Sequence, residues 1–336
     1  MSDINDFVIE NGVLTKYIGN DLEIQIPDNI TAIGDEAFRN CCRIISILIP
    51  DSVTSIGAQS FTNCQMLKTL AIPNSVISIG FRAFADCASL TNIEIPSKVY
   101  SIGQGAFSRC TSLFDIQVSR DNEVYKSVDG NLYTYDGMTL IQYAIGKKEN
   151  CFIVPESVTN IGYGAFAFCE NLHYISLSKK LLRIEDSAFM GCTNLANVII
   201  PESVLHLGDA LFMDCVSITD ITIPNGICEI SRMMFWGCTS LKEVLIPNSV
   251  DTINQCSFTR CENIKKITIP SGVTNIGDSV FSDCRNLITV EVPDSVINIG
   301  RYAFEGCRKV NLVASHGSYA ERYARKHKRI NFVPRN

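Results

Sequence analysis

Cysteine is the residue type that first suggests chemistry in this 336-residue chain, which contains 15 of them. Eleven occupy one recurring position, 23 residues apart except for one longer gap, namely Cys41, Cys64, Cys87, Cys110, Cys169, Cys192, Cys215, Cys238, Cys261, Cys284 and Cys307. Thiols in such a series could form disulfides, bind a metal or relay electrons. Stacked copies would bring neighbouring thiols near the Cα separation that a disulfide tolerates, so the spacing alone leaves bridges open.

Metal and redox chemistry both lack their usual partners in this sequence. It contains no CxxC pair and no HExxH motif, and its four histidines, His173, His206, His316 and His327, lie at unrelated positions. We therefore predict that the eleven cysteines are reduced, buried thiols that pack as small hydrophobic side chains. Any reactive thiol is expected among the four outside the series, Cys42, Cys151, Cys228 and Cys256.

Other catalytic signatures are missing as well. The sequence has no GxxxxGK[ST], no GxGxxG after a strand and no GxSxG, and its carboxylates are scattered singly. Its net charge of −6 argues against nucleic acid as the main partner. These observations predict a protein that is not an enzyme and that uses no cofactor and no metal.

A 23-residue repeat must position the side chains. Each copy starts at a proline, or at Ser119 or Ser178, and has Ile or Leu six residues later, Phe eleven, Cys fourteen and Leu, Ile or Val seventeen residues later. An alternating run such as Ile93–Ile95 then indicates a strand with one buried face. The Ala-Phe-x-x-Cys segment is expected to form a single helical or 3₁₀ turn on the opposite side. Because one copy cannot bury its apolar residues alone, the copies must stack on a shared core.

The pattern IPxSVxxIGxxAFxxCxxLxxI, which covers residues 27–314, resembles the bacterial BspA-like leucine-rich repeat family. The glycine of the pattern is replaced in three copies, by Glu185, Ser231 and Asn254, so a left-handed backbone is not obligatory there. The resemblance implies a leucine-rich-repeat solenoid of the α/β type. In such a fold a curved right-handed superhelix carries a parallel β-sheet on its concave face and short helical or 3₁₀ turns on its convex face. It also implies protein or surface recognition, with some members acting as adhesins, and no catalytic activity.

The copies divide the chain into segments of one continuous solenoid domain. We predict a β-rich N-terminal cap at 1–26, four turns at 27–118, a repeat with an inserted β-meander at 119–154, seven turns at 155–314 and a C-terminal helical cap at 315–336. Two Asp-Gly pairs inside 119–154 indicate the turns of the meander. Because its end, Ile145–Pro155, echoes Ile18–Pro27 of the N-terminal cap, we hypothesise that the insert is a degraded second cap.

The C-terminal segment is basic, with a net charge of +5 over residues 315–336. A basic tail can bind nucleic acid or anionic lipid. The favoured alternative is a helix with Ser318 as its N-cap, because Tyr319, Ala320 and Tyr323 give it an apolar side to place on the last repeat. Family members often end in a similar Gly-Ser-Tyr-Ala-Glu stretch, which agrees with capping.

Outward positions on the concave sheet supply the candidate binding residues. Phe114, His173 and Tyr174 are expected to cluster where the insert leaves and rejoins the repeats, and Ile199 and Leu245 are further apolar candidates on that sheet. Exposed aromatic side chains on a rigid surface resemble an interaction hot spot. Alternatively, the insert packs down and uses its tyrosines, Tyr125, Tyr133, Tyr135 and Tyr143, together with those aromatics as a small core of its own.

The predicted partner is a protein or a surface polymer, with the oligomeric state left open. No apolar run reaches the 18 residues of a membrane span, and the acidic start MSDINDFVIENG lacks the features of a secretory signal. The sequence as given is therefore interpreted as cytoplasmic, or as extracellular or on the cell surface if a leader was removed. The second reading is an exported cell-surface adhesin that binds host extracellular-matrix proteins.

Overall fold

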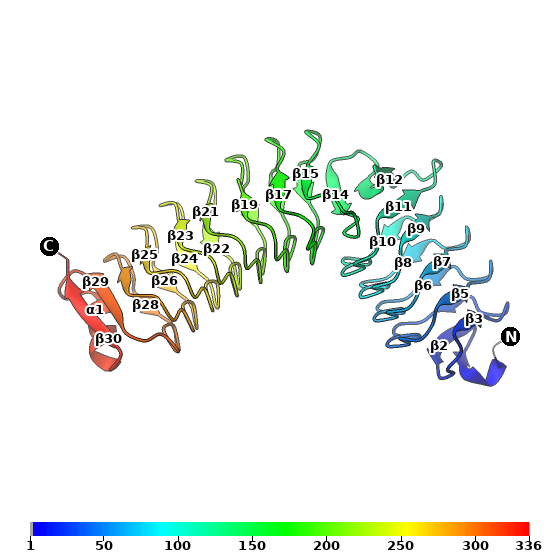
Figure 1. The fold of residues 1–336 in the computed structure, drawn as a ribbon, viewed down its shortest axis with the longest axis horizontal. Helices are drawn as coiled ribbons and strands as arrows, with labels where there is room; N and C mark the ends of the chain where they lie inside the picture. The colour runs from blue at the N-terminus through cyan, green and yellow to red at the C-terminus, as the bar shows by residue number, and fades with distance from the viewer. Residues whose placement is uncertain (1–2, 336) are drawn as a thin grey trace. The chain divides into compact units, whose positions relative to one another are not determined.

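The computed structural model describes residues 3–335, which separate into two compact units. Among these residues, unit 1 comprises 3–148 with Gly162–Cys169, and unit 2 comprises Glu149–Ile161 with 170–335. Within each unit the repeats stack as successive turns of a parallel β-solenoid (Figure 1). The stacked repeats expected from the 23-residue period are therefore confirmed, as is the leucine-rich-repeat solenoid that the resemblance implies.

Unit 1 opens with the 3₁₀ helix η1 (Ile4–Asp6) and the antiparallel hairpin β1 (Phe7–Glu10) and β2 (Val13–Tyr17). A long-strand row then runs through its turns, made of β3 (Glu23–Gln25), β5 (Ser46–Leu48), β7 (Thr69–Ala71), β9 (Asn92–Ile95) and β11 (Asp115–Val118). A short-strand row accompanies it, made of β4 (Ala32–Ile33), β6 (Ser55–Ile56), β8 (Ser78–Ile79) and β10 (Ser101–Ile102). The inserted segment forms antiparallel strands β12 (Tyr125–Val128), β13 (Asn131–Thr134) and β14 (Thr139–Gln142).

Unit 2 repeats both rows. Its long-strand row consists of β15 (Cys151–Ile153), β17 (Tyr174–Ser176), β19 (Asn197–Val198), β21 (Asp220–Thr222), β23 (Glu243–Leu245), β25 (Lys266–Thr268), β27 (Thr289–Glu291), β29 (Val310–Ala314) and β30 (Ile330–Pro334). Its short-strand row consists of β16 (Asn160–Ile161), β18 (Arg183–Ile184), β20 (His206–Leu207), β22 (Glu229–Ile230), β24 (Thr252–Ile253), β26 (Asn275–Ile276) and β28 (Asn298–Ile299). Helix α1 (Tyr319–Lys326) lies between β29 and β30, which pair in parallel.

The short-strand row was not expected from the sequence. It forms because the Ile or Leu six residues past the proline, buried in all turns but that of the partly buried Ile102, pairs with the same position of the next turn. Ile33 pairs in this way with Ile56, and Ile56 with Ile79. A strand of two residues is too short to show the alternation by which strands are recognised in a sequence. Each turn therefore contributes two strands to the solenoid.

The Ala-Phe-x-x-Cys segments form linked turns, and no α-helix is assigned to them in the described chain. Within a turn the Cys64 N–H donates to the Phe61 carbonyl oxygen at 3.1 Å, as in a 3₁₀ helix. The N–H of Phe61 donates instead to Ala83 of the next turn, at 2.8 Å. Gln59 and Asn63 adopt left-handed φ angles of 52° and 64°, which interrupts helical geometry on both sides of the phenylalanine.

The glycine seven residues past the proline permits close contact between turns. A Cβ atom on Gly57 would lie 2.6 Å from the backbone nitrogen of Asp35, although the φ of Gly57 is not in the left-handed region. Glycine is therefore favoured at this position because there is no room for a side chain, and not because the backbone adopts an unusual conformation.

The insert and the N-terminal cap of unit 1 end in the same way. The carbonyl oxygens of Leu14 and Leu140 each accept from a glycine of the turn that follows, at 2.8 Å. The N–H groups of Tyr17 and Tyr143 each donate to an alanine of that turn, and both rings pack on its phenylalanine. The insert and the N-terminal cap thus make matching contacts with the turn that follows each of them, and the origin of the insert as a second cap stays a hypothesis.

Candidate recognition surface

The outward side of the long-strand row is the surface on which the candidate binding residues lie, and we call it the sheet face. In unit 1 the strands alternate, so that Ile24, Ile47 and Leu70 are buried inside the solenoid. Their neighbours along each strand point outward and align in rows across strands, Glu23 beside Ser46 and Ser46 beside Thr69. The sheet face is thus a flat array in which each turn places two side chains at fixed positions.

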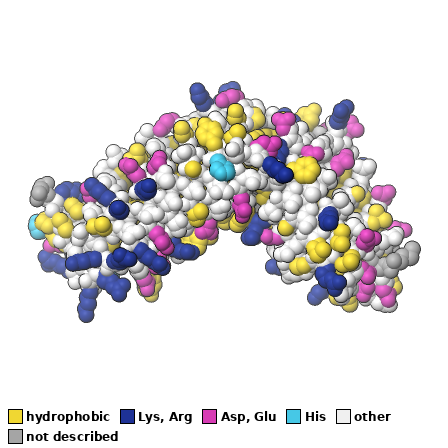
Figure 2. Space-filling model, viewed as in Figure 1, with side chains coloured by type: hydrophobic (Ala, Val, Ile, Leu, Met, Phe, Trp, Pro, Cys, Tyr) yellow, Lys and Arg dark blue, Asp and Glu magenta, His cyan; other side chains and the backbone are white. Residues whose placement is uncertain are grey.

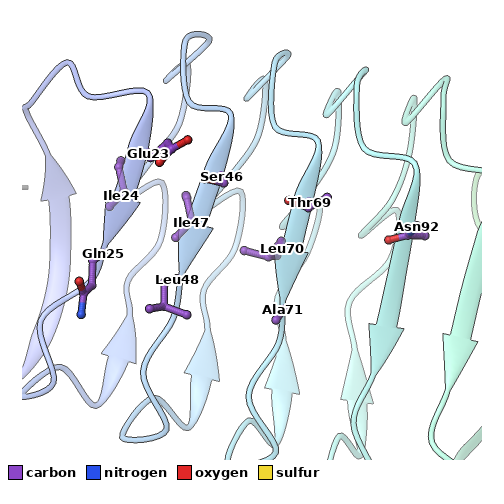
Figure 3. A pocket seen from close by; sticks show the side chains of 10 residues that line it. All are labelled: Glu23, Ile24, Gln25, Ser46, Ile47, Leu48, Thr69, Leu70, Ala71 and Asn92. Carbon is purple, nitrogen blue, oxygen red and sulfur yellow. The ribbon is translucent and has the colours of Figure 1, made fainter. Parts of the chain in front are cut away.

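A shallow cavity of about 580 Å³ lies on the sheet face of unit 1 (Figure 3). Its lining comes from four neighbouring turns, and consists of Glu23, Ile24, Gln25, Ser46, Ile47, Leu48, Thr69, Leu70, Ala71 and Asn92. Leu48 is the large apolar residue of this lining that is exposed, with 57% of its surface open to solvent, and it also borders a second cavity of about 470 Å³. Leu48 therefore offers apolar contact surface among polar neighbours, an arrangement suited to binding.

Two isoleucines and a tyrosine form an apolar patch on the sheet face of unit 2. Tyr174 on β17 pairs with Asn197 on β19, and Ile153 on β15 lies beside Ser176 on β17. Ile199 directly follows β19. Ile153 is 72% exposed and Ile199 is 79% exposed, although both are large apolar side chains. We call Ile153, Tyr174 and Ile199 the apolar patch.

Leu245 lies further along unit 2, on β23, and lines a small cavity of about 300 Å³. The cavity is otherwise polar at its rim, where Asp220, Lys242 and Glu243 stand. Leu245 is half-exposed and is surrounded by charged groups of both signs. This part of the sheet face is therefore less apolar than the patch around Tyr174.

The predicted binding residues are all exposed, but they do not all share one place. Phe114 lies in unit 1, just before β11, whereas His173, Tyr174, Ile199 and Leu245 lie in unit 2. His173 precedes Tyr174, and its Nδ1 atom lies 2.9 Å from the carbonyl oxygen of Asn171. The structure brings Tyr174 and Ile199 to neighbouring strands; the grouping of Phe114 with His173 and Tyr174 stays a prediction.

Sequence reasoning left Leu48 and Ile153 out of the candidate site. Both stand two residues before a proline, a position that Thr222, Thr268 and Glu291 fill in other turns. Ile199 and Leu245, which are predicted binding residues, hold the same position in their own turns. An apolar residue at this position was therefore the signal by which Leu48 and Ile153 could also have been found.

Most tyrosines of the insert are buried, and two of them contact the repeats. Tyr125, Tyr133 and Tyr143 are buried, and burial raises the pKa of Tyr133 to about 12. The Tyr125 hydroxyl accepts a hydrogen bond from the Ile102 N–H at 2.9 Å and so closes the end of the short-strand row of unit 1. Tyr135 alone among these four remains exposed. Two of these tyrosines thus join the core of the repeats: Tyr125 belongs to the core of unit 1 and Tyr143 stacks on Phe166. Phe114 stays half-exposed outside that core.

The repeated cysteines pack beside the stacked phenylalanines of the core. Neighbouring rings lie 5.1 to 5.8 Å apart, between centroids, along Phe38, Phe61, Phe84 and Phe107 of unit 1 and along Phe189, Phe212, Phe235, Phe258, Phe281 and Phe304 of unit 2. The cysteine thiols donate to phenylalanine carbonyl oxygens one turn earlier, at 3.0 to 3.2 Å, from Cys64, Cys87, Cys110, Cys215, Cys238, Cys261, Cys284 and Cys307. Burial raises the pKa of Cys110 to about 12.

All the cysteines are free thiols, and those of the series are buried except Cys41, which is half-buried. Outside the series, Cys151 and Cys228 are exposed, whereas Cys42 and Cys256 are half-buried. Among residues 3–335, no group of three His, Cys, Asp or Glu side chains is placed to hold a metal ion. The thiols of the series are therefore built into the fold as donors to backbone carbonyl groups.

A family model described as the BspA type leucine rich repeat region matches six copies, over residues 16–130, 146–264 and 182–311. A leucine-rich repeat protein from Eubacterium ventriosum is similar in structure, with a TM-score of 0.77 and 23% identity over 88% of each chain. One from Bacteroides ovatus has a TM-score of 0.55 and 27% identity, over all of this chain and 94% of the other. The pneumococcal vaccine antigen PcpA has a TM-score of 0.52 and 17% identity, over 94% and 79%.

No curated protein shows a significant match to the chain. The single α-helix of the described residues, α1, has neither the length nor the apolar character of a membrane-crossing helix.

Proposed function

Since the chain belongs to the BspA-type leucine-rich repeat family, we propose that it is a recognition protein, which binds a protein or a surface polymer through its sheet face. Proteins of this family are generally non-enzymatic scaffolds. The single observation that carries the proposal is the apolar patch of unit 2, where Ile153 and Ile199 are more than two-thirds exposed on the strands that flank the strand of Tyr174. Soluble proteins seldom keep several large apolar side chains together in water without a binding use for them.

The backbone under the apolar patch is fixed before a partner arrives. The patch residues stand on or beside β15, β17 and β19, which pair in register, and the alternate residues Phe152 and Ile175 point the opposite way. A partner therefore meets side chains whose backbone needs no ordering, which lowers the entropic cost of binding. Ser176 is the residue in register with Ile153, so Tyr174 lies diagonally from the isoleucines, two residues earlier on the middle strand. Tyrosine is enriched in interaction hot spots.

The test compares partners captured by wild type with those captured by Ile153→Glu/Ile199→Glu, using tagged protein returned to its source cells and quantitative mass spectrometry. Leu205→Glu/Ile297→Glu is the matched control, because these side chains are 65% and 72% exposed but lie beside the short-strand row. We expect the sheet-face variant to lose a partner that the control keeps. Equal recovery of every partner by both variants would refute the proposal.

The alternative, an exported adhesin that binds host matrix proteins, uses the same surface and differs in location. Protease treatment of intact source cells decides between the two readings. Loss of the protein from intact cells supports the adhesin, and direct binding of immobilised matrix proteins then becomes the assay. Full protection, together with digestion after lysis, removes the adhesin and leaves an intracellular partner.

A further inference from the structure

The last turn of unit 2 leaves a set of backbone donors without acceptors. In the turn before it, the N–H groups of Ser279, Phe281 and Asp283 donate to carbonyl oxygens of the last turn, at 2.9, 2.8 and 2.6 Å. The equivalent residues of the last turn are Tyr302, Phe304 and Gly306. Their N–H groups point toward a following turn that does not exist, and no acceptor for them is present among residues 3–335.

These three donors stand at the positive end of a stacked array. In every turn of unit 2 the same N–H groups point toward the C-terminus, and the carbonyl groups that they meet point back. Peptide dipoles aligned in this way add up, with partial positive charge at the end that presents unpaired N–H groups. Backbone N–H groups in turns with alternating left-handed residues, such as Tyr302 at φ 57° and Gly306 at φ 74°, form concavities that attract anions.

A cavity of about 650 Å³ lies at this end, between the last turn and the C-terminal cap (α1, β30 and the loop that joins them). It is lined by all three residues that carry the free donors, and by the following set: Arg301, Glu305, Tyr323, Lys326, His327, Lys328, Arg329 and Ile330. The cavity is therefore large enough for a small organic molecule and not only for a single ion.

Four cationic side chains line this cavity, namely Arg301, Lys326, Lys328 and Arg329, against the single carboxylate of Glu305. None of the four makes an ion pair within residues 3–335, whereas the neighbouring Arg325 is paired with Glu321 at 2.7 Å. Figure 2 shows Lys and Arg side chains gathered over the C-terminal part of unit 2. The excess of positive charge thus coincides with the free backbone donors.

Aromatic rings form another side of the cavity. The Tyr323 and His327 rings stack with centroids 4.0 Å apart, and Tyr323 packs edge-on against Phe304. Tyr302 is 66% exposed and lines the same space. A ligand held here can therefore place an anionic group on the N–H donors and an apolar or ring-shaped group against these side chains.

We propose that this cavity binds a small phosphomonoester. A phosphomonoester carries nearly two negative charges and three terminal oxygens at neutral pH, which suits several N–H donors and four cations better than one carboxylate does. The site does not depend on the sheet face, so its ligand is separate from the protein or polymer partner proposed above. The chemistry leaves two sources for the group: a soluble phosphomonoester, or the headgroup of a phosphorylated lipid.

The test follows backbone amide signals of the full chain by NMR during titration with phenyl phosphate, inorganic phosphate and benzoate. We expect the amide signals of Tyr302, Phe304 and Gly306 to shift most, with phenyl phosphate binding tightest and benzoate weakest. Phe281 is the internal control, since its N–H is already bonded to Ala303. Shifts spread evenly over basic surface residues, or equal responses to benzoate and phosphate, would overturn the proposal.

Charge-reversed variants give an independent measurement by calorimetry. Lys328→Glu/Arg329→Glu should weaken phenyl phosphate binding by about tenfold or more, because charge-assisted hydrogen bonds are lost. Lys242→Glu/Lys265→Glu, on the sheet face, is the matched control and should bind as wild type does. Equal weakening by both variants would show non-specific attraction and reject the site.

A second arm separates the two sources of the phosphate group. Vesicles of phosphatidylcholine containing phosphatidic acid present the same group on a lipid. If the protein sediments with these vesicles and phenyl phosphate displaces it, the ligand is the lipid headgroup. If the protein does not sediment with the vesicles but still binds phenyl phosphate, the ligand is a soluble phosphomonoester. The proposal is contradicted if Lys328→Glu/Arg329→Glu still binds the vesicles and the amide signals of Tyr302, Phe304 and Gly306 do not shift.

Discussion

The thiol of Cys87 donates a hydrogen bond to the carbonyl oxygen of Phe61, 3.2 Å away and one turn earlier in the solenoid. The same oxygen accepts the N–H of Cys64 at 3.1 Å, so both of its lone pairs are used. Cys87 therefore links two turns while it fills space beside the stacked phenylalanines, and seven other cysteines of the series make the same hydrogen bond. This explains a cysteine at every turn without a disulfide or a metal.

The first prediction concerns the contribution of one thiol to stability. Cys87→Ala should lower the free energy of unfolding by about 1–2 kcal/mol, because it removes a buried sulfur atom and a hydrogen bond. Urea denaturation followed by circular dichroism measures the change. Cys228→Ala, at an exposed cysteine, is the control and should leave the midpoint almost unchanged. Similar losses in both variants would show that the thiol ladder has no structural role.

The second prediction is a loss of stability at alkaline pH. Burial raises the pKa of Cys110 to about 12, whereas an unfolded thiol titrates near 8.5. The folded chain keeps this proton where the unfolded chain releases it, so stability is complete below about pH 8.5 and falls as the pH rises toward 12. The slope from this thiol is about 1.4 kcal/mol per pH unit.

Measuring that slope requires a variant, because tyrosines and lysines also titrate in this range. Urea midpoints at pH 8, 9 and 10 should fall less steeply for Cys110→Ala than for wild type. The exposed Cys151 supplies the comparison, since Cys151→Ala should retain the wild-type slope. A Cys110→Ala slope as steep as that of wild type would mean that the buried thiol does not govern the loss.

The third prediction concerns a buried amide at the start of the insert. Asn122 is 1% exposed, and its Nδ2 group donates to the carbonyl oxygens of Pro96 and Val99, at 2.8 and 2.9 Å. Its Oδ1 atom accepts the N–H groups of Val124 and Tyr125. Asn122→Ala leaves these groups unpaired and should cost about 3 kcal/mol or more.

Hydrogen exchange locates this effect. Amides of β12 should exchange faster in Asn122→Ala than in wild type, because the variant releases the backbone that leads into that strand. Asn197→Ala, at an exposed asparagine, should change neither stability nor exchange in β12. Unchanged exchange in β12 would show that the insert is held by its tyrosines alone.

The repeat could be predicted from sequence because each turn buries the same side chains at the same positions. A period of 23 residues recurs eleven times, so the solenoid and its long strands follow from packing alone. The contacts of Asn122 were not predicted, because one asparagine in a loop does not reveal which carbonyl groups it meets. The cavity at Tyr302 was missed for a similar reason: its donors are backbone groups, which every residue but proline possesses.

Strand β30 shows how the C-terminal cap differs from a helix alone. Sequence analysis found α1 and its N-cap Ser318, but Ile330–Pro334 also extends the long-strand row by pairing with β29. The alternation of Ile330 and Phe332 is too short to separate a strand from a loop. Only one strand follows α1, so no further repeat stacks on the last turn. The side of that turn that presents the N–H groups of Tyr302, Phe304 and Gly306 is therefore left open to a ligand.

The fourth prediction concerns the carboxylate that holds the start of α1. The Glu321 side chain accepts the Gly317 N–H at 2.6 Å and the Arg325 guanidinium at 2.7 Å, and the Ser318 hydroxyl accepts the Glu321 N–H at 3.2 Å. The hydrogen bond from Gly317 is the main reason that the pKa of Glu321 lies below its ordinary value. Its stabilising effect is therefore present above about pH 4.3 and is lost as the pH falls through the lowered pKa.

Hydrogen exchange of α1 at pH 6 and at pH 3.5 tests this prediction after correction for intrinsic rates. Wild type should lose protection of α1 at the lower pH, whereas Glu321→Gln should be less protected at pH 6 and change little on acidification, because its amide carries no titrating charge. Glu305→Gln is the control, since Glu305 precedes α1 and takes no part in this cap. An acid response of Glu321→Gln equal to that of wild type would assign the pH dependence to another group.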